Sequence, residues 1–145
     1  MSNAEEATIV LVEDDPGHAY LIQRNLRRLR VKNKIVLLEN GQKAVDYLVS
    51  EVAKPDASPL LMLLDLNLPV LDGYQVLQWI KEDERTRRIP VIVLTTTDNK
   101  QEVLRCYKLG CSVYITKPID YTDFVGMLER IRELLTVLTV PTNVA

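Results

Sequence analysis

The chain has 145 residues, of which 47% are hydrophobic and 26% are charged, and its formal net charge is −2. This length allows one domain with a substantial core, and the slightly acidic balance argues against nucleic acid or an anionic membrane as a partner. The two cysteines lack the spacing of metal ligands or of a disulfide framework, and the chain has neither a signal-peptide pattern nor an apolar stretch of about 18 residues. We therefore expect a single-domain cytoplasmic protein.

Five short apolar runs predict five β-strands, at residues 8–12, 34–38, 60–64, 90–94 and 112–116. Most are apolar throughout, which is typical of strands covered on both faces in a parallel sheet. The segments between them carry apolar residues at three- and four-residue spacing, as amphipathic helices do. This alternation predicts an α/β fold with a doubly wound five-stranded parallel sheet and five helices. We expect this domain at 7–138, between a flexible N-terminus at 1–6 and a C-terminal tail at 139–145.

Helix start and stop signals support the same alternation. Four helix starts are predicted by the pairs Asp15–Pro16, Asp72–Gly73, Asp98 with Gln101, and Asp120 with Asp123. Gly110 predicts the end of the fourth helix. Residues 50–59 contain Pro, Ser and Asp, and predict a surface loop between the second helix and the third strand.

Polar side chains lie at the carboxyl ends of four predicted strands. Glu13 and Asp14 follow the first strand, Asp65 follows the third, Thr95 follows the fourth and Lys117 follows the fifth. In an open parallel sheet, ligands bind at this edge, near the point where the strand order reverses. These residues, which are far apart in the sequence, can therefore meet in one crevice.

The three acids of this set predict a cation site. Carboxylates held about 5 Å apart would repel one another by roughly 3 kcal/mol per pair at an effective dielectric near 20, and one lysine offsets only part of that. All candidate ligands are oxygens, so the expected metal is a hard one, Mg²⁺ or Mn²⁺. Such a metal accepts a phosphoryl oxygen, which makes Asp65 a candidate nucleophile toward phosphorus. Lys117 would balance the phosphoryl charge, and Thr95 would donate a hydrogen bond to it.

The motifs that contain these residues resemble those of a known family. The segments VEDD (12–15), LLDLNLPVLDG (63–73), VIVLTTT (91–97) and VYITKP (113–118) are similar to four motifs of the receiver domain of two-component response regulators, the CheY-like group. These motifs are the acidic pair, the phosphoacceptor segment, the switch-hydroxyl strand and the Lys-Pro ending. The resemblance extends from about Thr8 to Leu135 and implies a flavodoxin-like sheet with strand order 2-1-3-4-5.

The resemblance implies a metal site for Mg²⁺ or Mn²⁺. Its ligands would be Glu13, either directly or through water, Asp14, Asp65 and the backbone carbonyl of Asn67. All four groups offer oxygen atoms, in agreement with the donor set that the strand ends predict.

The resemblance also implies the roles of the remaining site residues. Asp65 would be the phosphoacceptor and Lys117 would contact the phosphoryl group. Thr95 would be the switch hydroxyl and Tyr114 the aromatic side chain that changes rotamer, while a cis peptide bond would precede Pro118. The chain would thus contribute to its own phosphorylation and dephosphorylation without being an enzyme in the usual sense.

Two longer phrases narrow the resemblance and indicate partners. Residues 72–97 and 107–124 look like the single-domain regulators associated with bacterial phytochrome kinases, so a sensor histidine kinase, of phytochrome type, is the expected partner. On the last helix, Leu134, Val137 and Val140 form a second apolar stripe beside the stripe that faces the core. An apolar surface of this kind suggests burial against a partner, and we expect a homodimer through the fifth helix and its neighbours.

Two alternative functions compete with the phosphoaccepting switch. One is a phosphatase of the haloacid-dehalogenase-like type. That class has an Asp-x-Asp motif on its first strand, whereas here Asn67 stands where the second Asp would be, and the nucleophile follows the third strand. The other is a receiver-like adaptor that dimerises without phosphorylation. The lone histidine, His18, falls on the first predicted helix, where we expect a surface imidazole rather than an internal phosphodonor.

Overall fold

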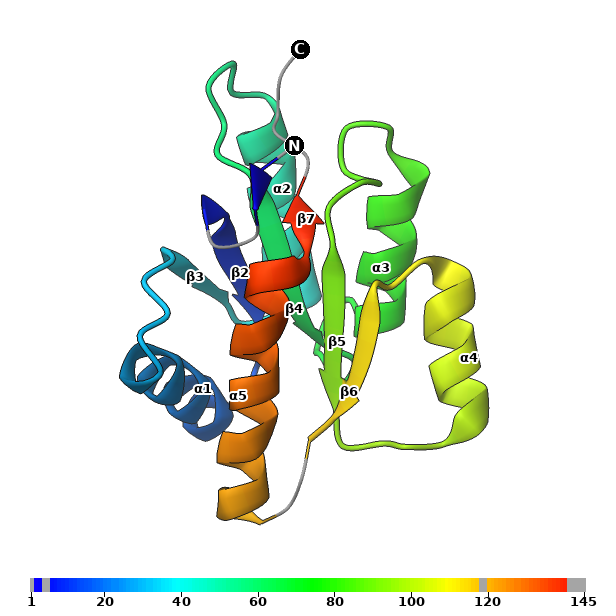
Figure 1. The fold of residues 1–145 in the computed structure, drawn as a ribbon. Helices are drawn as coiled ribbons and strands as arrows, with labels where there is room; N and C mark the ends of the chain where they lie inside the picture. The colour runs from blue at the N-terminus through cyan, green and yellow to red at the C-terminus, as the bar shows by residue number, and fades with distance from the viewer. Residues whose placement is uncertain (1, 4–5, 118–119, 141–145) are drawn as a thin grey trace.

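Five parallel strands form the central sheet, in the order β3-β2-β4-β5-β6 (Figure 1). They are β2 (Thr8–Val12), β3 (Ile35–Leu38), β4 (Leu60–Asp65), β5 (Val91–Thr95) and β6 (Val113–Thr116). The computed structural model describes residues 2–3, 6–117 and 120–140. Because β1 lies outside this sheet, the observed order is the 2-1-3-4-5 arrangement that the family resemblance implies, and the expected fold class is confirmed.

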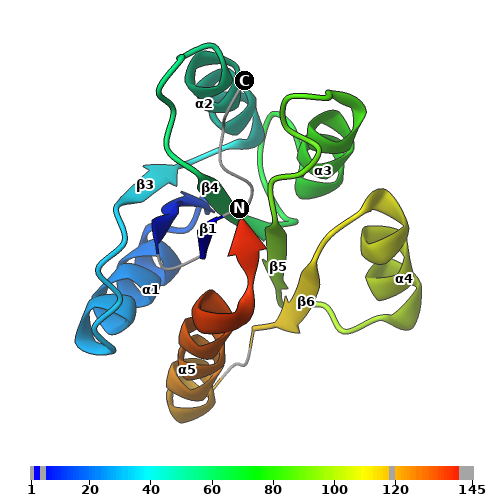
Figure 2. The same ribbon diagram turned by 45° about the horizontal axis from the view of Figure 1, so that its top comes forward.

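Helices cover both faces of the sheet. They are α1 (Pro16–Arg28), α2 (Gly41–Val52), α3 (Gly73–Glu82), α4 (Lys100–Leu109) and α5 (Tyr121–Val137). Figure 2 shows α1 and α5 on one face and α2, α3 and α4 on the other, which is the doubly wound arrangement. Each face has its own hydrophobic core, because successive strand residues point to opposite sides: Ile9 and Leu11 pack in one core, Val10 and Val12 in the other.

Burial separates the central strands from the edge strands. Every residue of β2, β4 and β5 is buried, as their uninterrupted apolar sequences predict. The residues of β3 and β6 are half-buried or exposed, because each of these strands has a neighbour on one side only. The apolar content of the two edge runs therefore overstates how deeply they are covered.

Most predicted helix ends are confirmed. Asp15, Asp72 and Asp120 are the N-caps of α1, α3 and α5, and Gly110 ends α4 in the left-handed conformation with φ 101°. The predicted start of α4 at Asp98 is wrong by one residue, because Asn99 is the N-cap and its side chain accepts a hydrogen bond from the backbone N–H of Gln101 at 2.9 Å. The predicted loop at 50–59 is shorter than expected, since α2 continues to Val52.

A small antiparallel ribbon joins the two ends of the chain. Strand β1 (Ser2–Asn3) pairs with β7 (Thr139–Val140), so residues from both predicted terminal segments lie side by side beyond the carboxyl end of α5. Two-residue strands carry no detectable periodicity, and for this reason the sequence did not predict the ribbon. None of the described helices combines the length and apolarity that a bilayer crossing requires.

Candidate functional site

The carboxyl ends of the strands bring the predicted site residues together. Asp65 is the last residue of β4 and Thr95 is the last residue of β5, while Glu13 directly follows β2 and Lys117 directly follows β6. Parallel pairing in register sets these positions: Val12 lies opposite Leu64, Asp65 opposite Leu94 and Thr95 opposite Thr116. Neighbouring strands therefore end at the same edge of the sheet.

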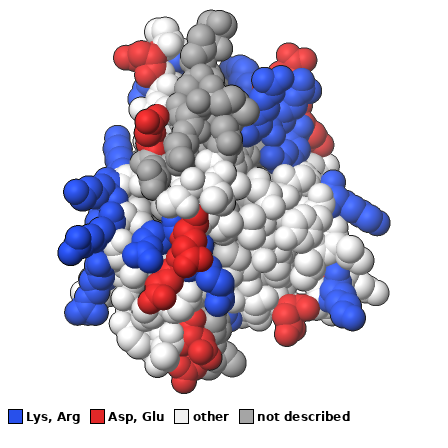
Figure 3. All heavy atoms as spheres, in the orientation of Figure 1, with Lys and Arg blue, Asp and Glu red and all other residues white. Residues whose placement is uncertain are grey.

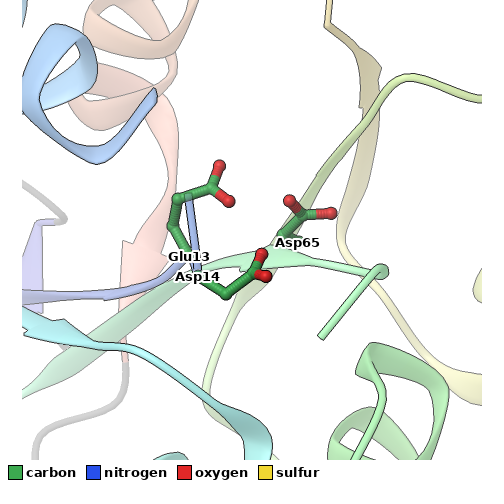
Figure 4. A group of neighbouring side chains, drawn as sticks. All are labelled: Glu13, Asp14 and Asp65. Carbon is green, nitrogen blue, oxygen red and sulfur yellow. The ribbon is translucent and has the colours of Figure 1, made fainter. Parts of the chain in front are cut away.

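Three carboxylates converge at this edge (Figure 4). One oxygen of each of Glu13, Asp14 and Asp65 lies within 4.8 Å of the others. Glu13 and Asp65 are buried, whereas Asp14 is exposed, so the cluster has one side open to solvent. This spacing is close to the separation of about 5 Å at which we expect strong repulsion between the carboxylates. All three groups present the hard oxygen atoms that Mg²⁺ or Mn²⁺ prefers.

Lys117 supplies the compensating positive charge. Its side chain is only 3% exposed, and its ammonium donates hydrogen bonds to Glu13 Oε1 and, at 3.1 Å, to Asp65 Oδ2. The other oxygen of the Asp65 carboxylate, Oδ1, accepts the backbone N–H of Asn67 at 3.0 Å. The carboxylate of Asp65 is therefore held in a fixed orientation by contacts on both oxygens, which suits a nucleophile that must attack in line.

Burial changes the acid–base properties of Glu13. Desolvation and, to a smaller extent, the adjacent Asp65 raise the pKa of its carboxyl, the contact with Lys117 opposes both effects, and the net pKa is about 7. The raised pKa means that the charged form of Glu13 is disfavoured even though Lys117 contacts its carboxylate. A cation bound between the carboxylates would favour their charged forms.

The hydroxyl of Thr95 is buried without a partner. The residue has 0% exposure, and its Oγ1 has no hydrogen-bond partner among the residues that the structure describes. Nearly all buried hydroxyls in proteins are paired, because an unpaired one costs about 1–3 kcal/mol of desolvation. An unpaired hydroxyl at the same strand edge as Asp65 fits a group that awaits an acceptor such as a phosphoryl oxygen.

Two further predicted residues lie around this centre. Asn67 is exposed in the loop after β4, two residues from Asp65. Tyr114 on β6 is half-buried, and its hydroxyl donates to the carbonyl of Thr97 at 2.6 Å, in the loop after β5. Burial, together with nearby negative groups, raises the pKa of Tyr114 to about 12, so it is a neutral donor. The predicted cis bond before Pro118 lies outside the described residues.

His18 belongs to the edge of the site, which the sequence analysis missed. Its Nδ1 lies 3.4 Å from Lys117 Nζ and 3.8 Å from Glu13 Oε1, and its side chain is 42% exposed. The prediction of a surface imidazole is therefore only partly correct, because the ring is partly exposed but also contacts Lys117. A usable signal was present, because His18 lies in the first turn of a helix that begins at the strand edge where Glu13 and Asp14 lie.

Residues 9–129 match the response regulator receiver domain family. The chain belongs to this family. The expected resemblance, the fold and the role in two-component signalling are therefore confirmed. Receiver domains are signalling domains, and the four strand-end motifs that indicated the family are those that form the site described above.

Three relatives illustrate the similarity. The probable methanogenesis regulatory protein FilR2 of Methanothrix harundinacea is 41% identical over 125 residues, which cover 86% of this chain and 81% of FilR2. Response regulator Rcp1 of Synechocystis is 36% identical over 92% of each chain, and the structure of its Mn²⁺-bound form has a TM-score of 0.83. The phosphorylated cyanobacterial phytochrome response regulator RcpA has a TM-score of 0.84 at 36% identity, covering 94% of this chain and 99% of RcpA.

Proposed function

We propose that Asp65 accepts a phosphoryl group from a sensor histidine kinase, and that the modified chain signals by changing its protein contacts. The observation that carries this proposal is the arrangement around Asp65. Its carboxylate lies between two other acids and a buried ammonium, at the strand edge where Thr95 has an unpaired hydroxyl. The phosphorylated state of the relative RcpA supports the same chemistry.

The proposed reaction is an in-line displacement at phosphorus. An oxygen of the Asp65 carboxylate forms the new P–O bond, the P–N bond to the kinase histidine breaks, and the imidazole leaves with the bonding electrons and takes up a proton. Lys117 already donates to Asp65 Oδ2, so its ammonium is placed to neutralise charge on the transferred group. We assign the hydroxyl of Thr95 as a donor to a phosphoryl oxygen.

The acidic cluster fits a divalent cation. We assign Glu13, Asp14, Asp65 and the backbone carbonyl of Asn67 as the groups that would hold Mg²⁺ or Mn²⁺, because the three carboxylates converge within 4.8 Å and offer oxygen only. When bound, the cation supplies positive charge beside the phosphoryl oxygens. The Mn²⁺-bound form of the relative Rcp1 supports this assignment.

Thr95 and Tyr114 are the proposed switch. The Tyr114 hydroxyl donates a hydrogen bond to the Thr97 carbonyl, and this contact connects β6 to the loop after β5. A movement of Thr95 toward a phosphoryl group would shift this loop, because Thr97 is only two residues away. Tyr114 would then change rotamer, and the surface formed by α4, β6 and α5 would report the modification.

One experiment tests the proposed function against its alternatives. Wild type and Asp65→Asn are treated with acetyl phosphate and Mg²⁺ and analysed by intact-mass spectrometry. One phosphoryl group on wild type alone is the expected result. Continuous release of phosphate from phosphate esters would instead support a phosphatase, and absence of any phosphoryl group on folded wild type would support an adaptor that acts without phosphorylation.

We propose a phytochrome-type kinase as the phosphodonor. The support is the similarity of nearly the whole chain to RcpA, a phytochrome response regulator. FilR2, which is described as a methanogenesis regulator, is 41% identical, so similarity alone does not select the kinase class. Phosphotransfer time courses from purified candidate kinases decide the question, since a cognate kinase transfers fastest and a faster transfer from another class would overturn this choice.

We also propose a homodimer through α5 and its neighbours. Val137 on α5 is 72% exposed, and Figure 3 shows an uncharged area between the charged side chains of α5 and those of α4, over β5 and β6. Leu134, part of the predicted stripe, packs partly against its own core and contributes less than expected. Light scattering on Val137→Glu should show more monomer than wild type, whereas Val49→Glu on α2 should not. A monomeric wild type at micromolar concentrations, phosphorylated or not, contradicts the proposal.

A further inference from the structure

The ammonium of Lys117 is surrounded by acceptors. A lysine ammonium has three N–H donors and no acceptor. Among the described residues, Glu13 and Asp65 receive two of these donors, and the remaining neighbour within hydrogen-bond distance is His18 Nδ1 at 3.4 Å. Because Lys117 is almost completely buried, water has little access to the third N–H. The imidazole of His18 is therefore the group that can satisfy it.

This contact determines the tautomer of the imidazole. The ammonium can only donate, and Glu13 Oε1, the acceptor that also faces Nδ1, lies 3.8 Å away, beyond hydrogen-bond distance. We therefore assign Nδ1 of His18 as the acceptor and place the proton of the neutral ring on Nε2. We make this assignment from the hydrogen-bond network, since ring hydrogens follow from their partners.

The position of His18 is set by two helices. Its backbone N–H donates to the cap residue Asp15 at 3.1 Å, in the first turn of α1. Its ring lies against Phe124 of α5, with 6.4 Å between ring centroids and a tilt of 35°. The imidazole is thus anchored by its backbone and by its ring, and its Nδ1 points to Lys117 rather than freely into solvent.

We propose that His18 is a positioning residue for phosphoryl transfer, because its Nδ1 orients the ammonium of Lys117 beside Asp65. This inference rests on the proposed function of Asp65. A neutral acceptor is suited to this task, since it directs the ammonium without adding a fourth negative charge that would repel an incoming phosphoryl oxygen.

Two substitutions separate the acceptor from the ring. His18→Asn keeps an acceptor, Oδ1, at the same number of bonds from the backbone as Nδ1, but removes the ring contact with Phe124. His18→Phe keeps the ring and removes the acceptor. With acetyl phosphate and Mg²⁺, the phosphorylation rate of His18→Asn should stay within about twofold of wild type, and that of His18→Phe should fall about fivefold, as expected for one hydrogen bond. Thermal unfolding verifies that both variants fold.

A measurement on the unsubstituted protein gives an independent test. His18 is the only histidine in the sequence, so the imidazole ¹⁵N spectrum of protein without an affinity tag, recorded at about pH 8, belongs to this residue. The expected spectrum shows a protonated Nε2 and an unprotonated Nδ1.

The outcomes distinguish this inference from the proposed function. A ring protonated on Nδ1, a His18→Phe rate equal to that of wild type, or a slow His18→Asn beside a fast His18→Phe would each overturn the positioning role while Asp65 remains phosphorylated. Failure of wild type itself to accept a phosphoryl group would instead overturn the proposed function.

Discussion

Because the hydroxyl of Thr95 is unpaired, removing it should stabilise the protein, whereas most substitutions of buried residues destabilise it. Thr95→Val keeps the shape and the full burial of the side chain but removes a hydroxyl that has no partner among the described residues. Because such a hydroxyl costs about 1–3 kcal/mol of desolvation, the variant should be more stable than wild type by about 1 kcal/mol. Most substitutions in a protein core destabilise it, so this result would not arise by default.

The chain contains a matched control. Thr86 is also completely buried, but its hydroxyl donates to the carbonyl of Ile80 at 2.7 Å. Thr86→Val loses this hydrogen bond and leaves a buried carbonyl short of a partner, which should cost about 1–2 kcal/mol. The same change at the same burial thus gives opposite signs, and the two variants should differ by roughly 2–3 kcal/mol.

Equilibrium unfolding in urea measures both values. The proteins are compared without metal or phosphodonor, and unchanged slopes of the unfolding free energy against urea show that the substitutions act on stability alone. If Thr95→Val destabilises the protein as much as Thr86→Val does, the hydroxyl of Thr95 is already paired in the unphosphorylated state. In that case the Thr95 hydroxyl would not be held free for a phosphoryl oxygen.

Three further predictions each concern one residue. Val70 has φ 71° and is 75% exposed, so Val70→Gly should relieve strain without losing packing and raise the unfolding free energy by about 0.5–1 kcal/mol in urea titrations; a destabilised variant contradicts this. Tyr114→Phe removes the hydrogen bond to the Thr97 carbonyl and should speed amide hydrogen exchange in the loop after β5. Unchanged exchange would show that this hydrogen bond does not restrain the loop. Burial raises the pKa of Glu13 from its ordinary value of 4.5 to about 7, so the folded state holds the proton over this range and, in EDTA, stability should fall as pH rises through it. Glu13→Gln should make stability less dependent on pH over this range. An equally steep dependence in this variant would show that another group causes it.

Local patterns in the sequence predicted the parallel five-stranded sheet and its five helices, whereas the strand order came from the family resemblance. Uninterrupted apolar runs predicted β2, β4 and β5 as buried parallel strands, and the caps Asp15, Asp72 and Asp120 marked three helix starts, because a cap acts on backbone groups two or three residues away. Parallel strands also end at a common edge, and this rule brought Asp65 and Lys117 together although 52 residues separate them.

Only the tertiary structure decided how the site is completed. The role of His18 depends on the direction of its ring toward Lys117, 99 residues away, and the isolation of the Thr95 hydroxyl depends on every group packed around it. No local pattern in the sequence signals either property, because each is set by contacts between segments that are far apart in the chain. The same reason applies to β1 and β7, whose pairing exists only because α5 returns the end of the chain to its beginning.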